Sequence, residues 1–197
     1  MSPEFDSVAA TNAVPLTLLP HPDNPPMAVG RVSAEVRPLA GGALQLQYRV
    51  DCAQDVLRPV QLATPGFADG LWRHTCFEAF LAPAGAEAYR EFNFSADGRW
   101  AGYRFGAWRA RCGDLRGLPP PRLKIAARGD GLNAEVVLPA ALLEDAEAVD
   151  LGLTAVLERH DGVLSYWALA HAPGPADFHW RAGFCYRLAR DPGGEQR

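Results

Sequence analysis

Apolar and polar residues alternate along most of the chain, in short runs that end at glycine or proline. The runs VGRVSAEVRPL (29–39) and ALQLQYRVD (43–51) flank Gly41 and Gly42, and this arrangement predicts a β-hairpin. The other alternating runs are 72–81, 88–95, 99–105, 121–128, 132–139, 149–160, 163–170 and 183–190. One short helix is predicted from Pro139 to Glu147, where a proline precedes a run rich in alanine, leucine and glutamate.

About ten strands at regular spacing, with one short helix, predict an all-β chain. We expect an antiparallel, jelly-roll-like β-sandwich of two sheets. The proline-rich stretches at 20–26 and 118–121 are too short to separate domains, and no repeat of fixed period is visible. The sequence therefore predicts a single domain over 1–197, with a flexible N-terminus of roughly 1–13 and a C-terminal tail at 191–197.

The run LWRHTCFEAF (71–80) is an unusual strand, because one side of it is polar. Successive side chains of a strand point to opposite faces. Phe77 therefore lies on one face, whereas the other face carries an indole, an imidazole, a thiol and a carboxylate, from Trp72, His74, Cys76 and Glu78.

The next two runs continue this division into an aromatic side and a polar side. Neighbouring antiparallel strands must match face to face, so the aromatic side is expected to form the core. We assign the aromatic side to Phe77, Phe92, Phe94, Tyr103 and Phe105. We assign the polar side, which would face solvent or a ligand, to Glu78, Glu91, Asn93, Ser95, Trp100, Gly102 and Arg104.

The register of the first two of these strands can be narrowed by charge. Glu78 directly opposite Glu91 would place two like charges together, which is unfavourable. A shift of two residues places Glu78 opposite Asn93 and Cys76 opposite Ser95, and we predict this second register.

A polar face with tryptophans at its edges has the groups that a sugar needs. The apolar face of a sugar ring stacks on an indole, and its hydroxyl groups need paired donors and acceptors such as those of Glu78, Asn93 and Arg104. In the alternative interpretation Trp72 and Trp100 are packed under loops, and Glu78 and Arg104 form a structural ion pair.

Two other chemistries can be considered. Glu78 and Glu91 could act as the acid and nucleophile of a glycosidase, but nothing in the sequence supports the required separation, and no catalytic residue is predicted.

The loop HAPGPADFHW (171–180) contains His171, Asp177 and His179, which could hold a divalent metal ion. The alternative is that Asp177 caps a turn while the imidazoles bond to the backbone, and no metal site is predicted.

Charge and cysteine content limit the partners and the environment. The chain has 19 basic and 23 acidic residues, a net charge of −4, so it lacks the basic surface typical of nucleic-acid binding. The start of the sequence has no basic segment followed by a long apolar one, and we expect a cytoplasmic protein that does not enter a membrane. Four scattered cysteines without a CxxC pair predict four free thiols. The oligomeric state is left open.

Three segments resemble a known family: LWRHTCFEAFL (71–81), YREFNFSADGRWAGYRFGAWR (89–109) and LAHAPGPADFHWRAGF (169–184). They resemble bacterial DOMON-like proteins, a group related to family-nine carbohydrate-binding modules and to DOMON domains. The resemblance extends from about Gly30 to Arg190. It implies an antiparallel β-sandwich whose relatives bind sugars or haem. The motif positions it supports are Trp72, His74, Cys76, Glu78, Asn93, Ser95, Trp100, Tyr103, His171, Asp177, Phe178 and His179.

Haem-binding relatives commonly use methionine and histidine as axial ligands, as the resemblance implies. The only methionines here are Met1 and Met27, so a Met/His haem site is poorly supported, and the pair His171 and His179 is left as the alternative. No cofactor is required by the sequence, with haem and a divalent metal kept as alternatives.

Together these patterns predict a binding domain for a small molecule, a saccharide or sugar derivative, rather than an enzyme. An enzyme acting on a sugar or a substrate derived from the cell wall, a haem-binding domain, and a structural or partner-binding domain are the alternatives. The expected ligand-binding residues are Trp72, His74, Glu78, Asn93, Trp100, Arg104, His171 and His179.

Overall fold

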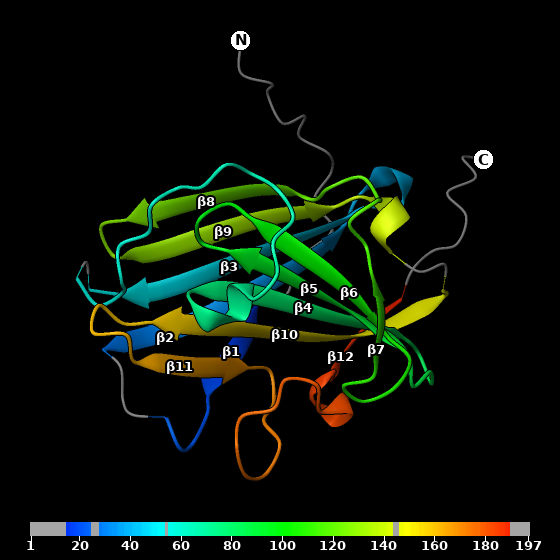
Figure 1. Cartoon of the computed structure of the whole chain (residues 1–197). Helices are drawn as coiled ribbons and strands as arrows, with labels where there is room; N and C mark the ends of the chain where they lie inside the picture. The colour runs from blue at the N-terminus through cyan, green and yellow to red at the C-terminus, as the bar shows by residue number, and fades with distance from the viewer. Residues whose placement is uncertain (1–14, 25–27, 54, 144–145, 190–197) are drawn as a thin grey trace.

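Two antiparallel layers of strands pack face to face in the computed structural model of the chain (Figure 1). The structure describes residues 15–24, 28–53, 55–143 and 146–189. The predicted flexible ends, 1–13 and 191–197, lie outside these ranges. Strands dominate the described residues and helical turns are short, so the predicted all-β sandwich is confirmed.

We name the layer nearest the viewer in Figure 1 the front sheet, with strand order β7-β6-β5-β4-β10-β11 and with β12 paired to β10. Its strands are β4 (Cys76–Pro83), β5 (Tyr89–Ser95), β6 (Trp100–Phe105), β7 (Arg111–Asp114), β10 (Ala148–Glu158), β11 (Leu164–Ala168) and β12 (Tyr186–Ala189).

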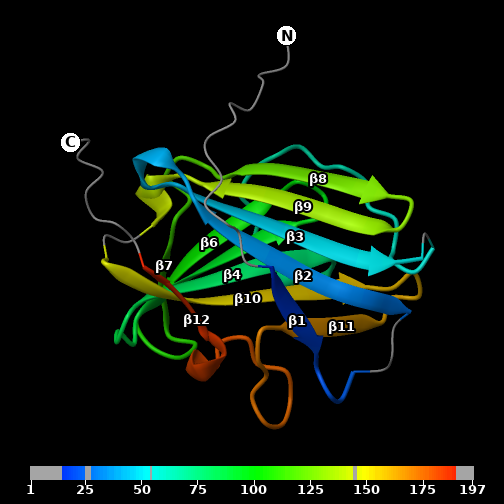
Figure 2. The same ribbon diagram turned by 180° about the vertical axis from the view of Figure 1, so that it is seen from behind.

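The back sheet has the order β2-β3-β9-β8 and faces the viewer in Figure 2. Its strands are β2 (Val29–Pro38), β3 (Leu44–Cys52), β8 (Arg122–Arg128) and β9 (Gly131–Leu138). The first strand, β1 (Leu16–Pro20), joins the layers, because Leu16 to Leu18 pair with β2 while Leu19 and Pro20 pair with β11.

The main core lies between the sheets and follows from the alternation of each strand. Phe77, Phe92 and Phe94 are fully buried on the inner face of the front sheet, as predicted. Leu46 and Val50 of β3 are fully buried on the facing side. The burial of such side chains is the main favourable contribution to folding.

Several predicted hairpins are present with the expected partners: β2 with β3, β5 with β6, β8 with β9, and β10 with β11. The predicted register of β4 and β5 is also confirmed, since Glu78 lies opposite Asn93 and Cys76 opposite Ser95. The cysteines Cys52, Cys76, Cys112 and Cys185 are all free thiols, as predicted.

The predicted helix from Pro139 to Glu147 is wrong for its described part. A single 3-10 turn, η3 (Ala140–Leu142), stands there, and Leu143 already has extended backbone angles. So short a segment gains too few hydrogen bonds to offset the cost of starting a helix. The other helical turns among the described residues are η1 (Ala40–Gly42), η2 (Leu71–Arg73) and η4 (Arg181–Gly183), and none is long enough to cross a membrane.

The sequence analysis also missed or extended some strands. β1 and β7 were not predicted, and the run 183–190 contributes only the short strand β12, after the turn η4. The run 72–81 begins too early, because β4 starts at Cys76 and the preceding residues form η2.

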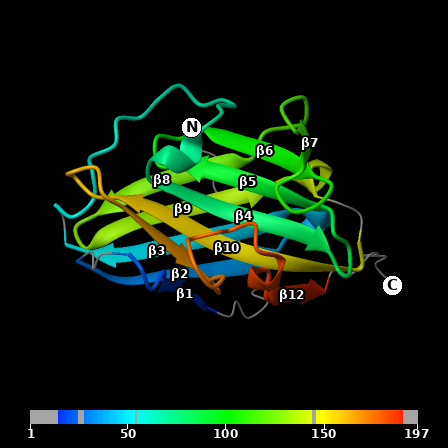
Figure 3. The same cartoon turned by 60° about the horizontal axis from the view of Figure 1, so that its bottom comes forward.

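A second buried cluster covers the outer face of the front sheet. It consists of Leu71, Cys76, Phe80, Ala82, Tyr89, Ala101, Tyr103, Phe105 and Phe184. The segment that follows β11 and the turn η2 lie on this side of the molecule (Figure 3). Gly152 of β10 permits the close approach of this segment, since a side chain there would meet the Phe184 ring at 2.7 Å. The outer face of the front sheet is therefore an interior surface in its own right.

Candidate ligand-binding cavity

A cavity of about 490 Å³ lies over the outer face of the front sheet. We name it the front cavity. Its floor comes from β4, β5, β6 and β10, and its sides come from η2, the turn after β6, β11 and the segment after β11. The lining residues are Trp72, Arg73, Glu78, Phe80, Glu91, Tyr103, Phe105, Arg109, Arg111, Val156, Leu164, Tyr166, Ala176, Phe178 and His179.

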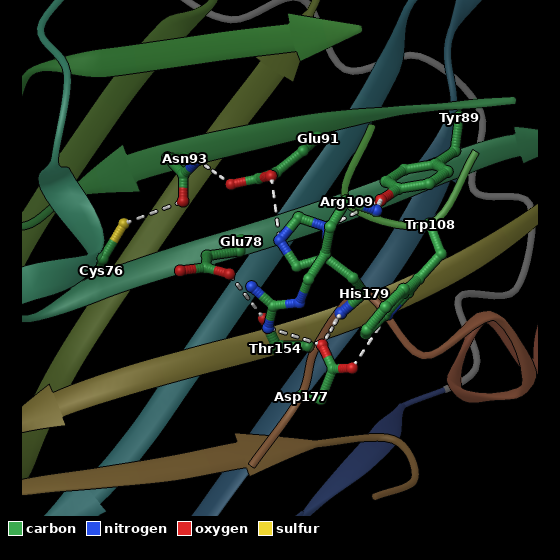
Figure 4. A network of polar contacts seen from close by, with 10 residues as sticks. All are labelled: Cys76, Glu78, Tyr89, Glu91, Asn93, Trp108, Arg109, Thr154, Asp177 and His179. Carbon is green, nitrogen blue, oxygen red and sulfur yellow. Dashed lines mark hydrogen bonds and ion pairs between the residues drawn. The ribbon is translucent and has the colours of Figure 1, made fainter. Parts of the chain in front are cut away.

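Two carboxyl groups form part of the floor, although both are buried. Glu78 is 3% exposed and Glu91 is 5% exposed. Thr154 on β10 lies opposite Glu78 and donates a hydrogen bond of 3.3 Å to its Oε2 (Figure 4). Asn93 donates from Nδ2 to Glu91 Oε1 at 2.6 Å, and its Oδ1 accepts from the Cys76 thiol at 3.7 Å. Each carboxyl thus keeps a fixed orientation toward the cavity.

The two carboxyl groups differ in protonation. Burial raises the pKa of Glu78 well above its ordinary value, the nearby charge of Glu91 raises it further, and the Thr154 hydrogen bond opposes both. Burial also raises the pKa of Glu91, to about 6, against the opposing effects of the Asn93 hydrogen bond and of the charges of Arg111 and Arg109. Near neutral pH, Glu91 is mostly ionised and accepts, whereas the environment of Glu78 favours its protonated form.

His179 lies beside Glu91 and is neutral. Burial, followed by the charge of Arg109, lowers the pKa of His179 to about 4, although Asp177 acts in the opposite direction. Tyr89 accepts a hydrogen bond of 3.1 Å from the backbone N–H of Arg109 and donates its own proton to His179 Nδ1 at 2.7 Å. The remaining ring proton is then on Nε2, which is 3.7 Å from Glu91 Oε2 (Figure 4).

Asp177 connects the two segments that form one side of the cavity. Its carboxylate accepts hydrogen bonds from the Arg109 guanidinium at 2.8 Å, from the Trp108 indole at 3.0 Å and from the His179 backbone at 3.0 Å. Burial would raise the pKa of Asp177, but the hydrogen bonds from Trp108 and Arg109 hold it below its usual value. Arg109 has a positive φ of 53°, a conformation that costs energy for a side chain of this kind, and Asp177 holds it there.

An aromatic wall stands opposite this side. The Tyr103 hydroxyl donates to Asp69 at 2.8 Å, and the Arg111 guanidinium lies 3.9 Å above the Tyr103 ring. Trp72 meets the same ring edge to face at 6.3 Å and is 41% exposed, so the indole stands at the cavity mouth. Because Tyr103 is only 2% exposed, the accessible flat apolar surface of this wall comes from Trp72, next to charged hydrogen-bond donors.

Among the predicted ligand-binding residues, Trp72, Glu78 and His179 line the front cavity. Asn93 lies beneath it, fully buried, and supports Glu91. Ligand binding by each of these residues stays a prediction.

Trp100 and Arg104 were assigned to the wrong face. β5 and β6 pair with Phe94 opposite Trp100, so Trp100 lies in the core between the sheets, 4% exposed. Arg104 lies on that same face of β6, near the sheet edge, and is exposed. Tyr103 and Phe105, which were predicted on the core side, instead lie on the outer face, where Tyr103 is the direct partner of Glu91. The sequence analysis placed the aromatic residues of neighbouring strands on one common face. This was wrong because the outer face of the front sheet also carries apolar residues.

His74 and His171 also lie away from the cavity lining. His74 follows η2 outside β4, is largely exposed, and its Nδ1 is 2.8 Å from Glu158 Oε2 in a neighbouring polar cleft. His171 donates from Nε2 to the Leu19 carbonyl at 2.8 Å, and its ring packs against His21.

The haem alternative with His171 and His179 as ligands stays a prediction, and each ring has one nitrogen already bonded within the protein. His171 Nε2 is bonded to the Leu19 carbonyl, and His179 Nδ1 is bonded to Tyr89. Within the described part of the chain, no group of three histidine, cysteine or acidic side chains is arranged to hold a metal ion.

The sequence analysis did not predict five residues that line the front cavity. They are the arginines Arg73, Arg109 and Arg111 and the aromatic residues Tyr166 and Phe105. A partial signal was present in GAWRARC (106–112), where two arginines and a tryptophan directly follow a predicted strand. Which side of the sheet such a turn covers depends on packing between distant segments, and a local pattern does not carry that information.

Comparison of the fold with solved structures finds carbohydrate-binding proteins. A "putative carbohydrate-binding protein" from Bacteroides uniformis is similar with a TM-score of 0.64 at 19% identity, over 90% of this chain and 85% of that one. A family-nine carbohydrate-binding module from Caldicellulosiruptor kristjanssonii in complex with glucose has a TM-score of 0.54 at 12% identity, over 100% and 95%. A module of the same family and organism with cellotriose has a TM-score of 0.52 at 13% identity, over 88% and 83%.

No protein-family model and no curated protein sequence matches the chain. At identities of 12 to 19%, the structural likeness establishes the fold, a β-sandwich like that of family-nine carbohydrate-binding modules. The predicted relationship to DOMON domains stays a prediction.

Proposed function

We propose that the chain binds a saccharide in the front cavity. The observation that carries the proposal is the combination of two buried carboxyl groups with aromatic side chains around one cavity of about 490 Å³. Glu91 offers an acceptor that is mostly ionised near neutral pH, and Glu78 offers a second buried carboxyl group, while the exposed Trp72 offers flat apolar surface. A sugar presents hydroxyl groups at its edge and C–H groups on its ring faces, so both kinds of surface are used.

The energetics of the floor favour a function over a purely structural role. Burying a carboxyl group is unfavourable, and an apolar side chain at position 78 or 91 would pack against Phe80 at a smaller cost. Residues that reduce stability in this way are expected at functional sites. The sugar-bound relatives support the same proposal, since modules of similar fold are described in complex with glucose and with cellotriose.

Isothermal titration calorimetry with a sugar panel tests the proposal. The panel contains glucose, galactose, cellobiose and cellotriose together with the corresponding uronic acids. Glu91→Gln is the informative variant, because it keeps an acceptor for Asn93 but removes the negative charge that faces the cavity. Glu78 is less informative, because its buried environment favours the uncharged carboxyl and a change to glutamine then alters the charge less.

We expect at least one sugar of the panel to bind, and Glu91→Gln to weaken that binding about tenfold to hundredfold. This is the loss expected for one hydrogen bond to a charged group, roughly 1.5–3 kcal/mol. The matched control is Glu35→Gln on the outer face of the back sheet, where Glu35 forms a surface ion pair with Arg37. Absence of binding by every sugar of the panel, or equal weakening by both variants, would contradict the proposal.

A further inference from the structure

We infer that the saccharide taken by the front cavity carries a negative charge, and specifically a carboxylate. This inference rests on the proposed function and adds the class of ligand. Its basis is the rim of the cavity, where Arg73, Arg109 and Arg111 stand beside the floor formed by Glu78 and Glu91.

The rim has more positive than negative charge. Arg109 is paired with Asp177 at 2.8 Å. Asp69 is shared by two guanidinium groups, those of Arg111 at 3.5 Å and Arg116 at 3.3 Å. Among the residues that line the cavity, three arginines, Arg73, Arg109 and Arg111, stand beside two carboxyl groups, those of Glu78 and Glu91.

The floor offsets only part of this excess. The environment of Glu78 favours its neutral form, His179 is neutral, and Glu91 contributes one negative charge. The residues that line the cavity thus have a formal excess of one positive charge, from three arginines against two glutamates, although the whole chain has a formal net charge of −4. A local reversal of the overall charge, inside a recess, concentrates an anionic ligand.

The guanidinium groups are also held in fixed positions. Arg111 lies flat over the Tyr103 ring at 3.9 Å, and its contact with Asp69 is at the upper limit of a hydrogen bond. Arg109 is fixed by the Asp177 carboxylate. A guanidinium has five N–H donors, so each keeps further donors for a ligand beyond its acidic partner. Such pre-positioned groups match the two oxygens of a carboxylate.

The separation of floor and rim gives the ligand an orientation. Hydroxyl groups of the sugar would bind Glu78 and Glu91 at the floor, where a second negative charge would be repelled. The carboxylate would then point to the guanidinium groups of Arg109 and Arg111. A single charge balances the local excess of about one, which favours a carboxylate over a phosphate.

Matched sugars test the inference, because a uronic acid differs from its neutral partner only at C6, where a carboxylate replaces the hydroxymethyl group. Binding of glucose is compared with that of glucuronic acid and glucose 6-phosphate, and binding of galactose with that of galacturonic acid, at low and at high salt. We expect one uronic acid to bind at least about tenfold more tightly than its neutral partner, with the preference reduced by salt.

Arg111→Gln is the test variant and Arg122→Gln, at an exposed position of β8 in the back sheet, is its matched control. Arg111→Gln should weaken the binding of the uronic acid about tenfold more than it weakens the binding of the neutral sugar, while Arg122→Gln changes neither. If Arg111→Gln lowers the melting temperature, Arg109→Gln provides the second variant with the same expectation.

Equal binding of neutral and acidic sugars would overturn this inference and leave the proposed function intact. Preference for glucose 6-phosphate over both uronic acids would also overturn it. If no sugar of either kind binds, the proposed function itself fails.

Discussion

The two sheets carry the same alternation of polar and apolar residues, yet their outer faces have opposite properties. On the back sheet, Glu35, Gln47 and Arg49 are partly or fully exposed around a recess of about 450 Å³. On the front sheet, Glu78 and Glu91 are almost fully buried beside a cavity of about 490 Å³. The two volumes are similar, so volume alone does not identify a site.

The difference lies in what covers each face. The turn η2, the turn after β6 and the segment after β11 carry Trp72, Arg109 and Phe178 over the front sheet. Aromatic side chains next to buried ionisable groups give the front cavity recognition chemistry that the back recess lacks. Whether a polar row on a strand lines a cavity or faces solvent therefore depends on the distant segments that cover it.

The largest expected effect concerns the apolar part of the front face. Phe80 points outward from the front sheet but is only 1% exposed, and its ring stacks on Phe184 at 5.3 Å. Phe80→Ala should therefore cost as much as a core truncation, about 3–5 kcal/mol of unfolding free energy. Gln47 also points outward, from the back sheet. Gln47→Ala should change the unfolding free energy by less than about 0.5 kcal/mol. Chemical denaturation measures both, and similar small losses would show that the front face is not an interior surface.

A smaller effect is expected at the anchor between the covering segments. Asp177→Ala removes the acceptor of Trp108, Arg109 and the His179 backbone, so we expect a loss of about 1–3 kcal/mol in unfolding free energy. Asp130→Ala on the back sheet removes only exposed ion pairs with Arg128 and Arg49 and should cost about 0–1 kcal/mol. Faster hydrogen exchange in the segment after β11 should accompany only the first variant, and its absence would contradict the anchoring role.

The fold and the site differ in how far the sequence predicts them. The hairpin β10 to β11 and the buried faces of Phe77 and Phe92 follow from local alternation and turn residues, and these predictions are confirmed. Charge repulsion was enough to choose the register of β4 and β5. The same reasoning failed for Trp100, because the front sheet has apolar residues on both faces and pattern alone does not tell the two apart.

The site depends on contacts between residues far apart in the chain. Glu78 and Asn93 were placed on the correct face, but Arg109 meets Asp177 across 68 residues of sequence. His74 was assigned by extending a strand through residues that instead form the turn η2. Local patterns therefore predict the sheet, whereas the parts that cover it follow from tertiary packing.

The smallest expected effect is the dependence of stability on pH. The pKa of Glu91 is raised from 4.5 to about 6, so the folded chain holds this proton more tightly than the unfolded chain. Its contribution to stability therefore falls as pH rises from about 4.5 to about 6, by on the order of 2 kcal/mol, and is constant above. The lowered pKa of His179 acts in the opposite direction, so the native chain and Glu91→Gln must be compared at each pH.

Glu91→Gln should thus gain stability relative to the native chain between pH 4 and pH 7, as measured by urea denaturation. A constant difference between Glu91→Gln and the native chain over this range would contradict the burial of an ionisable group at position 91.

The central claim is that the front cavity, and not the recess of the back sheet, binds a sugar. Titration of isotopically labelled protein with glucose and with glucuronic acid, followed by amide chemical shifts in NMR spectra, tests it most directly. The account predicts that shifts change at Glu78, Glu91 and His179 and stay constant at Gln47 and Arg49. Changes confined to the back-sheet residues would contradict it.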